Sequence, residues 1–130
     1  MAIQNIIKNI QDIMRKDAGV DGDAQRLSQL VWLLFLKIFD DKEKEYELVD
    51  TKYSSPIPEK LRWRNWASNA EGITGDEMLD FINNKLFKQL KDLKFNSNDD
   101  PRGLIVKEVF EDTYNYMKSG TLIRQVVNKI

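Results

Sequence analysis

Apolar residues are densest between Gln25 and Tyr46, and their spacing there predicts a long helix. Six of them recur every three or four positions, as on one face of an α-helix: Leu27, Leu30, Val31, Leu34, Phe35 and Ile38. Others occupy the remaining faces: Trp32, Leu33, Leu36 and Phe39. A helix that is apolar nearly all round is normally covered on every side by other elements. The pattern therefore predicts a buried central helix over residues 23–46.

The charged segment from Asp40 to Glu45 lies at the end of this helix. We expect this segment to project into water, with Asp40 and Lys44 spaced for an i, i+4 ion pair. The apolar run contains Lys37, and it is about half the roughly 20 apolar residues that a transmembrane helix needs. The sequence therefore predicts a soluble domain without a membrane partner.

A shorter amphipathic helix is predicted over residues 2–17. Its apolar stripe is Ile3, Ile6, Ile7, Ile10, Ile13 and Met14. A core helix is the ordinary explanation of such a stripe, and an arm that packs on a partner chain is the alternative. The sequence leaves both open. Gly19 can end this helix, and Asp21 or Asp23 can cap the next one by accepting from its free N–H groups.

The second half of the chain predicts three further helices. Thr74 to Glu77 has the sequence of a capping box, and the helix that it opens should run to about Leu93. Asp100-Pro101 should start the next helix, which Ser119-Gly120 should end. The last helix, over residues 121–130, has no stop signal. We therefore expect a longer chain, of which residues 1–130 are one helical domain.

Residues 48–73 are the least regular part of the chain, because Pro56 and Pro58 interrupt any helix. Pro58 can stand at the start of a short helix, or Leu61 and Trp63 can alternate as a strand edge. We favour the short helix slightly. The fold class predicted for the chain is all-α, a single bundle of about five helices around the central helix.

The residue types that the chain lacks exclude several kinds of chemistry. It contains no histidine and no cysteine, which removes Ser-His and Cys-His catalysis, nearly all zinc sites and disulfides. Its six glycines are isolated, so no phosphate-binding glycine loop can form. We predict no catalytic, cofactor-binding or metal-binding residue in this segment. There is no signal peptide, and a cytoplasmic location is expected.

A basic and aromatic cluster is the strongest candidate for a ligand contact: Lys60, Arg62, Trp63, Arg64 and Trp66. Such cations can neutralise phosphates, and an indole can stack on a base or a sugar. In the alternative, both tryptophans pin the loop to the core and the cations are solvated or paired with Glu59 and Glu71. The residues alone favour that alternative, since buried tryptophan is common and three cations make a weak basic patch.

A second set of cations is spaced three residues apart: Lys85, Lys88, Lys91 and Lys94. Such a stripe is usually the solvated face of a helix, and contact with phosphates or with a partner is the alternative. Lys85 and Lys88 therefore join the cluster around Arg62 as candidate DNA or partner contacts.

Several blocks of the sequence closely resemble one family. They are the run from Asp21 to Asp40 (DGDAQRLSQLVWLLFLKIFD), the run from Leu61 to Ala67 (LRWRNWA), Gly72 to Gly75 (GITG) and Leu79 to Phe87 (LDFINNKLF). In order and spacing they are similar to the opening helical domain of the modification subunit (M, HsdM) of type I restriction-modification systems. The resemblance covers nearly the whole chain.

This resemblance implies a function in DNA modification. The family's M subunit is an S-adenosylmethionine-dependent methyltransferase that acts on adenine in double-stranded DNA. Its partners are a specificity (S) subunit, a second M subunit and a restriction (R) subunit. The opening domain is expected to contribute to subunit assembly and to closure of the complex around DNA.

The family's catalytic motifs are absent from these residues. Neither the Phe/Tyr-x-Gly-x-Gly cofactor loop nor the Asn/Asp-Pro-Pro-Phe/Tyr motif has a match, and Asp100-Pro101-Arg102 lacks the second proline and the aromatic residue. The methyltransferase domain is therefore expected after Ile130. The alternative function is that of a free-standing helical module that binds a partner protein through the stripe at residues 3–14.

Overall fold

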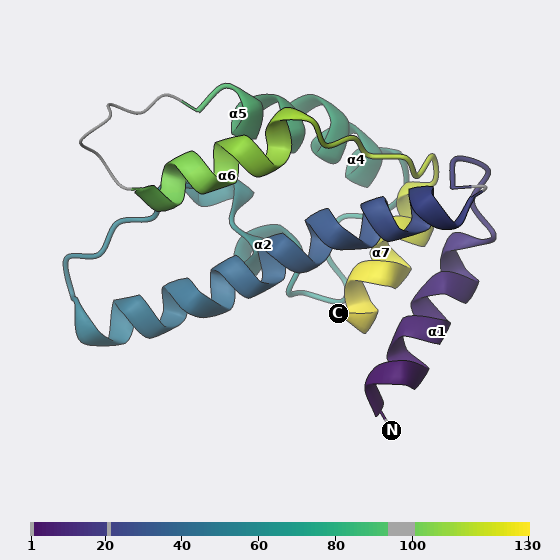
Figure 1. The fold of residues 1–130 in the computed structure, drawn as a ribbon, viewed down its shortest axis with the longest axis horizontal. Coiled ribbons are helices and arrows are strands. Elements are labelled where there is room, and N and C mark those ends of the chain that lie inside the picture. The colour runs from purple at the N-terminus through teal and green to yellow at the C-terminus, as the bar shows by residue number, and fades with distance from the viewer. Residues whose placement is uncertain (1, 21, 94–100) are drawn as a thin grey trace.

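The computed structural model describes residues 2–20, 22–93 and 101–130, and within these ranges the chain is helical, with no β-strand (Figure 1). The elements are α1 (Ala2–Met14), α2 (Asp23–Val49), the 3₁₀ helix η1 (Glu59–Leu61), α3 (Trp63–Trp66), α4 (Gly75–Asp80), the π-helical segment η2 (Phe81–Leu86), α5 (Phe87–Lys91), α6 (Pro101–Glu111) and α7 (Gly120–Lys129). The predicted all-α class is confirmed.

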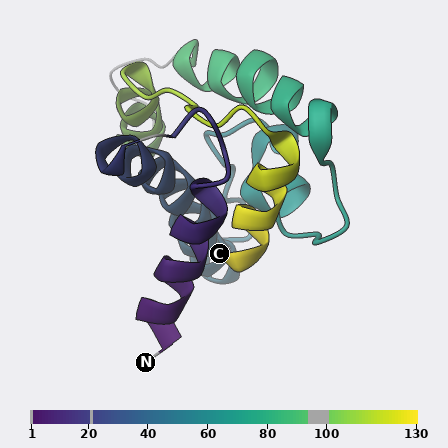
Figure 2. The same ribbon diagram turned by 90° about the vertical axis from the view of Figure 1, so that its right-hand side faces the viewer.

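Helix α2 runs along the whole molecule, and the other helices gather around one side and one end of it (Figure 1). The rod formed by α4, η2 and α5 lies above α2, and α5 packs against α6. At the other end, α7 packs against both α4 and α1, so the first and last helices of the chain lie side by side (Figure 2). No helix in the described ranges combines the length and hydropathy that a bilayer span requires.

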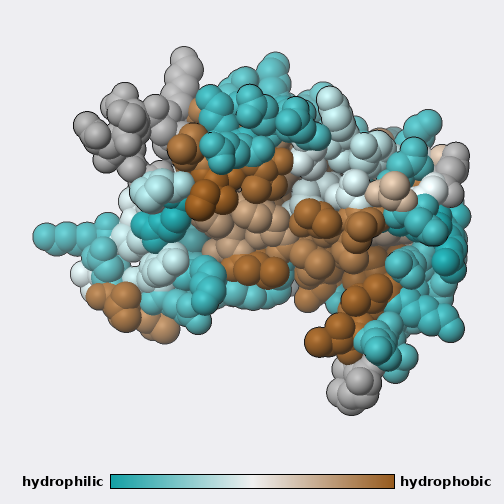
Figure 3. All heavy atoms as spheres, viewed as in Figure 1, coloured by the Kyte–Doolittle hydropathy of each residue, from teal (hydrophilic) through white to brown (hydrophobic). Residues whose placement is uncertain are grey.

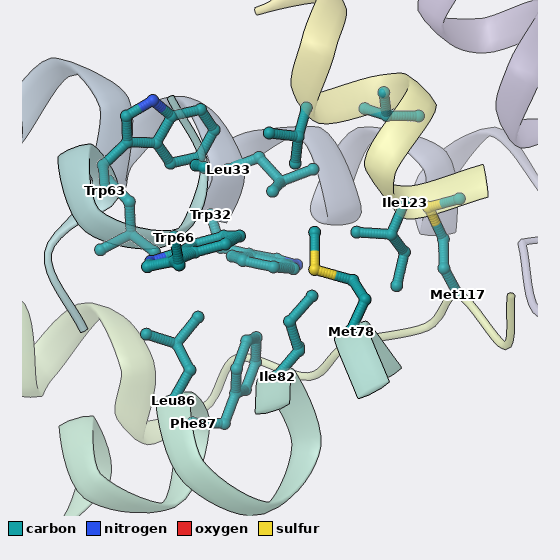
Figure 4. Close-up of a cluster of buried hydrophobic side chains, with 14 of the residues drawn as sticks. Trp32, Leu33, Trp63, Trp66, Met78, Ile82, Leu86, Phe87, Met117 and Ile123 are labelled. Atoms are coloured by element: carbon teal, nitrogen blue, oxygen red, sulfur yellow. The ribbon is translucent and has the colours of Figure 1, made fainter. Parts of the chain in front are cut away.

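The core is built around the fully buried Trp32 of α2. The ring of Phe87 meets it edge-on at 4.8 Å between centroids, and Phe110 packs on Phe87 at 5.2 Å. Figure 4 shows the indole of Trp66 next to that of Trp32 in the middle of this cluster. Aromatic pairs of this kind add to the hydrophobic effect of burial, so Trp32 ties α2 to α5 and, through Phe87, to α6.

Only one side of α2 is covered, which corrects the expectation of a helix buried all round. Leu30, Leu33 and Leu36 lie in the core with Trp32. On the opposite side a stripe of apolar residues is solvent-exposed: Leu27 (64%), Val31 (53%), Leu34 (36%) and Ile38 (57%). The prediction was wrong for this stripe because the packed helices all lie on the side of Trp32.

The charged end of α2 also differs from the prediction. Asp40 and Glu43 are buried, with exposed fractions of 2% and 1%, and do not project into water. The expected pair between Asp40 and Lys44 is present, with 3.8 Å between Lys44 Nζ and Asp40 Oδ2. The buried carboxylates therefore need further partners, which the segment around Arg62 supplies.

The predicted helix ends are correct in part. Gly22 occupies the cap position of α2 and Asp23 is its first helical residue, while Asp21 lies outside the described residues. Thr74 caps α4 by position, but its side chain accepts no capping hydrogen bond, so the predicted capping box is wrong. The sequence pattern thus predicted the positions at which these helices start, but not the hydrogen bonds of the capping residues.

Helix α6 is shorter than predicted. It starts at Pro101 as expected but ends at Glu111, and an extended segment leads from there to Ser119. Ser119 does not end α6; its hydroxyl caps α7 by accepting from the backbone N–H of Leu122 at 3.2 Å. The extended segment is held by Asp17, whose carboxylate accepts from the backbone N–H groups of Lys118 and Ser119.

The helix predicted from Thr74 to Leu93 ends at Lys91 and contains an unpredicted π-helical segment. Its fully buried residues recur every four positions: Met78, Ile82, Leu86 and Leu90. An α-helix has 3.6 residues per turn, so a period of four would drift around it. The wider π-helical turn offsets this drift and keeps the whole row on the core side.

Residues 48–73 form the short helices η1 and α3, which confirms the short-helix alternative. Pro58 directly precedes η1, and α3 follows at Trp63. Because η1 and α3 together contain few residues, most of this segment has no regular backbone hydrogen bonds. Side chains therefore have to hold it in place.

Helices α4 and α7 meet at a close backbone contact. A Cβ added to Gly120 would lie 1.7 Å from the carbonyl oxygen of Gly75 and 3.1 Å from the nitrogen of Leu79. Gly75 itself has a φ of 59°, a conformation that side-chain-bearing residues rarely adopt. This pair of glycines sets how closely the last helix approaches the core.

We expect Gly120→Ala to destabilise the fold by about 1–3 kcal/mol, because its methyl group would overlap the backbone of α4. Urea unfolding followed by circular dichroism would measure the change in stability. Gly22→Ala is the matched control, since the nearest atom to its added Cβ is in the flexible Gln25 side chain at 3.7 Å. Equal stability of the two variants would contradict the proposed close approach.

Candidate nucleic-acid and partner contact surface

The two tryptophans of the basic and aromatic cluster lie in the core. Trp63 and Trp66 are both buried, with their rings edge-on at 5.3 Å between centroids. The Trp66 indole N–H donates to the carbonyl of Leu61 at 2.9 Å, and its ring packs on Phe81. These contacts match the structural alternative, in which the indoles pin the loop. A stacking contact with a nucleic acid stays a prediction.

Arg62 is buried among three glutamates. Its Nη2 lies 2.8 Å from Glu47 Oε2 and 3.5 Å from Glu43 Oε1, and its Nη1 lies 3.4 Å from Glu59 Oε2. Glu59 was an expected partner. The other two come from the charged end of α2, and Glu71, the second expected partner, is not among the ion pairs of the described residues.

Arg64 binds the same end of α2. Its Nε donates to Asp40 Oδ1 at 2.8 Å and its Nη1 to Glu47 Oε1 at 2.8 Å. Glu47 therefore bridges the two arginines. This network explains why Asp40 and Glu43 can be buried, since a buried carboxylate requires a charged or hydrogen-bonding partner.

The network perturbs the acid–base behaviour of Glu47. The hydrogen bond from Arg62, followed by that from Arg64, lowers the pKa of Glu47 below its ordinary value of 4.5. Burial alone would lower the pKa of Arg62 and Arg64, but their bonds to Glu47 and the nearby carboxylates raise it overall. All three groups therefore remain charged at neutral pH.

An aromatic and cationic contact extends this network towards α6. The Tyr53 hydroxyl donates to Glu43 Oε2 at 2.8 Å. The Arg102 guanidinium lies 4.5 Å from the ring centre of Tyr46 and 4.6 Å from that of Tyr53. The sequence did not indicate this cluster, because Arg102 is far along the chain from Tyr46 and Tyr53 and the residues form no local pattern.

Arg124 was also missed, and it fixes the next part of the chain. It is buried, and its guanidinium donates to the backbone carbonyls of Trp66, Ala67, Asn69 and Ile73 at 2.8–3.1 Å. Its burial lowers the pKa of its guanidinium. An arginine on an apolar helix gave no sequence signal for such a role.

The candidate lysines differ from the arginines in being exposed. Lys60, Lys85 and Lys88 all face solvent. Lys88 and Asn84 share an open hollow of about 550 Å³ with Pro58, so the turn that leads to Lys60 adjoins the basic part of the η2–α5 rod. Lys91 lies over the ring of Tyr114 at 4.8 Å, and Lys94 lies outside the described residues.

The isoleucine stripe of α1 is divided between the core and the surface. Ile10 and Met14 are buried in the core, whereas Ile3, Ile6 and Ile7 are exposed. Figure 3 shows a continuous apolar band that crosses α2 and reaches α1. The carboxyl-terminal half of the stripe therefore holds α1 on the domain, and contact of the other half with a partner stays a prediction.

The architecture is that of an all-α domain, and its described residues include no cluster suited to a metal ion. The chain belongs to the HsdM N-terminal domain family, whose model matches residues 3–130. It is 61% identical, over all 130 residues, to the type I restriction enzyme EcoEI methylase subunit of Escherichia coli.

Two solved structures share this fold. One is a modification subunit assigned to a type I restriction enzyme of Vibrio vulnificus YJ016, with a TM-score of 0.88 and 36% identity over 98% of this chain. The other comes from work on complex assembly and conformational transition of the type I R-M system, with a TM-score of 0.78, 30% identity and the same coverage. The chain spans 26% of the EcoEI subunit and 30% and 25% of the two structures.

We expect Arg62→Ala to cost about 3 kcal/mol of folding free energy, because it leaves the buried Glu43 and part of Glu47 without their cation. Urea unfolding at neutral pH would measure this cost. Arg15→Ala is the control, since Arg15 and Asp12 form an exposed pair whose removal should cost less than about 1 kcal/mol. A similarly small cost for both variants would show that the network contributes little.

The lowered pKa of Glu47 predicts a pH-dependent stability. Ionised Glu47 stabilises the folded state above its unfolded pKa, and this contribution disappears as the pH falls through its folded pKa. Glu47→Gln should therefore be less stable than the parent at pH 7, and the difference should shrink below about pH 4.5. Unfolding midpoints across this range would test it, with the exposed Glu45→Gln as control. A difference that does not depend on pH would contradict the assignment.

Proposed function

We propose that this chain is the front domain of a type I methylase subunit, that it takes part in subunit assembly, and that it helps to close the complex around DNA. The family match and the 61% identity to the EcoEI subunit support the parentage. The proposed partners are the S subunit, a second M subunit, the R subunit and double-stranded DNA. The observation that carries the proposal is the presence of two separate exposed surfaces, an apolar face on α1 and α2 and the lysines Lys60, Lys85 and Lys88.

The apolar face supports a role in assembly. Exposed apolar residues of α1 and α2 form one continuous band (Figure 3). Monomeric proteins rarely expose large contiguous apolar patches, and such patches commonly mark contacts with other protein surfaces. The buried arginine network and Trp32 hold the opposite side of α2, so this face is left for contacts with protein surfaces outside the domain, in the same subunit or in another one.

The exposed lysines support contact with DNA. Lys60, Lys85 and Lys88 are exposed and take no part in the ion network that the two arginines form with α2. Lys88 lines an open hollow together with the amides of Asn84 and Gln89 and the carboxylate of Asp92. Lysines and side-chain amides are common donors to phosphate and sugar oxygens, which position a protein on DNA without reading its sequence. This fits a domain that closes on DNA while another subunit selects the site.

The methyl-transfer chemistry is proposed for the part of the subunit outside this chain. S-adenosylmethionine would supply the methyl group, but these residues do not fit it: the glycines stand singly, and none of five hollows on the described surface is lined by a glycine. We therefore place the cofactor and the adenine pocket in a domain that follows residue 130.

The DNA contact can be tested in the assembled enzyme by replacing Lys60, Lys85 and Lys88 with alanine. Removal of one phosphate contact should flatten the slope of log K against log salt concentration by about 0.9, and removal of all three by about 2.7. Affinity for specific and non-specific DNA should fall by similar factors, because phosphate contacts carry no sequence information.

A charge-matched control is the triple alanine variant at Lys8, Lys16 and Lys118, which are exposed near the other end of the domain. It should keep the parental slope. Equal slopes for both variants and the parent would remove these three lysines from the proposal and leave only the role in assembly.

A further inference from the structure

The exposed stripe of α2 has the geometry of a helix-packing seam. Leu27, Val31, Leu34 and Ile38 are spaced by four, three and four positions, with leucine alternating with a β-branched residue. This alternation is typical of the a and d positions along which one helix packs on another. At 1.5 Å per residue the seam is about 16 Å long, or three turns.

Two apolar grooves flank this seam. One, of about 230 Å³, lies between α2, α1 and the end of α7 and is lined by Ile3, Ile6, Ile7, Leu34 and Ile130. The other, of about 250 Å³, lies between α2 and α6 and is lined by Phe35, Ile38, Phe39, Tyr46 and Ile105. A ridge between two grooves is the surface onto which a helix with a broad apolar face can pack. The apolar band in Figure 3 follows this arrangement.

We propose that the seam is covered by an amphipathic helix from the part of the methylase subunit that follows residue 130. This inference rests on the proposed function, because it requires the longer subunit. In the EcoEI relative about three quarters of the chain lies outside the matched region. Lys129 and Ile130 line the first groove, so a following segment starts at the edge of the seam.

Tethering favours this occupant over a separate molecule. A segment joined to the domain by a short linker is present at an effective concentration in the millimolar range, far above that of a free subunit. It would also cover the seam before any partner arrives, which removes a surface that invites non-specific association. A second copy or the S subunit would have to displace this helix or bind elsewhere.

The first test is thiol accessibility in the full-length subunit. Residues 1–130 contain no cysteine, so Val31→Cys places a thiol on the seam, with the parent subunit as background. Leu48→Cys is the matched control, because Leu48 is an exposed apolar residue of the same helix, about 15 Å beyond Ile38. A charged maleimide should label Val31→Cys about tenfold or more slower than Leu48→Cys. This ratio corresponds to a seam that is uncovered for less than a tenth of the time.

The second test identifies what covers the seam. A photoreactive benzoylphenylalanine in place of Leu34 of the full-length subunit should cross-link to residues beyond 130 of the same polypeptide, with a yield that does not depend on concentration. Cross-linked dimers whose yield rises with concentration would overturn the inference in favour of a second copy. Equal labelling of Val31→Cys and Leu48→Cys in the isolated subunit would overturn it as well.

These outcomes are separable from those of the proposed function. A seam that is open in the isolated subunit but protected after addition of the S subunit would overturn the tethered helix while supporting a role in assembly. Failure of the lysine variants to change the salt dependence of DNA binding would instead affect only the DNA contact, since those lysines lie outside the seam.

Discussion

Arg124 holds the irregular segment between α2 and α4 inside the domain. A buried backbone carbonyl that makes no helical hydrogen bond needs another hydrogen-bond donor. The Arg124 guanidinium donates to four such carbonyls, those of Trp66, Ala67, Asn69 and Ile73. Gly72 lies so near that an added Cβ would stand 2.8 Å from Arg124 Nη2. Because Arg124 belongs to α7, the segment and the last helix depend on each other. The backbone position of Trp66 and of the residues up to Ile73 follows from this constraint.

The ion network of α2 fixes the other end of the same segment. Burying Asp40 and Glu43 carries a desolvation cost, and ion pairs in such places often add little net stability compared with apolar residues. The pairs with Glu43 and Asp40 do determine where Arg62 and Arg64 can lie. They thereby fix the position of η1 and α3 along the length of α2. The result is a turn whose Pro58 lies beside the η2–α5 rod, while the arginines that look most suited to DNA in the sequence hold the turn.

The elements that depend on local periodicity could be predicted from the sequence, whereas those that depend on distant partners could not. The helices around Trp32 and Ile123 were found because their apolar spacing repeats every three or four residues. The π-helical segment was not, although the strict four-residue spacing from Met78 to Leu90 was a readable signal for it. The pairing of Arg62 with Glu47 depends on the return of the chain towards α2, and nothing in the neighbourhood of either residue indicates it. The position of the segment after α6 likewise involves a remote contact, the hydrogen bonds from the backbone N–H groups of Lys118 and Ser119 to Asp17.

A helix that is apolar on all sides can be buried by its own domain or by a surface outside that domain. The two sides of α2 differ in this respect. Its Trp32 side is buried by the domain itself, whereas its Val31 side is exposed although it carries the same kind of residues. The spacing of apolar residues along a helix predicts that a face is covered, but it does not indicate which molecule covers that face. For a chain that spans about a quarter of its relatives, the face left open is therefore informative about the larger protein. We infer that the Val31 side is as apolar as a core because it belongs to a core that this domain completes only together with other parts of the methylase.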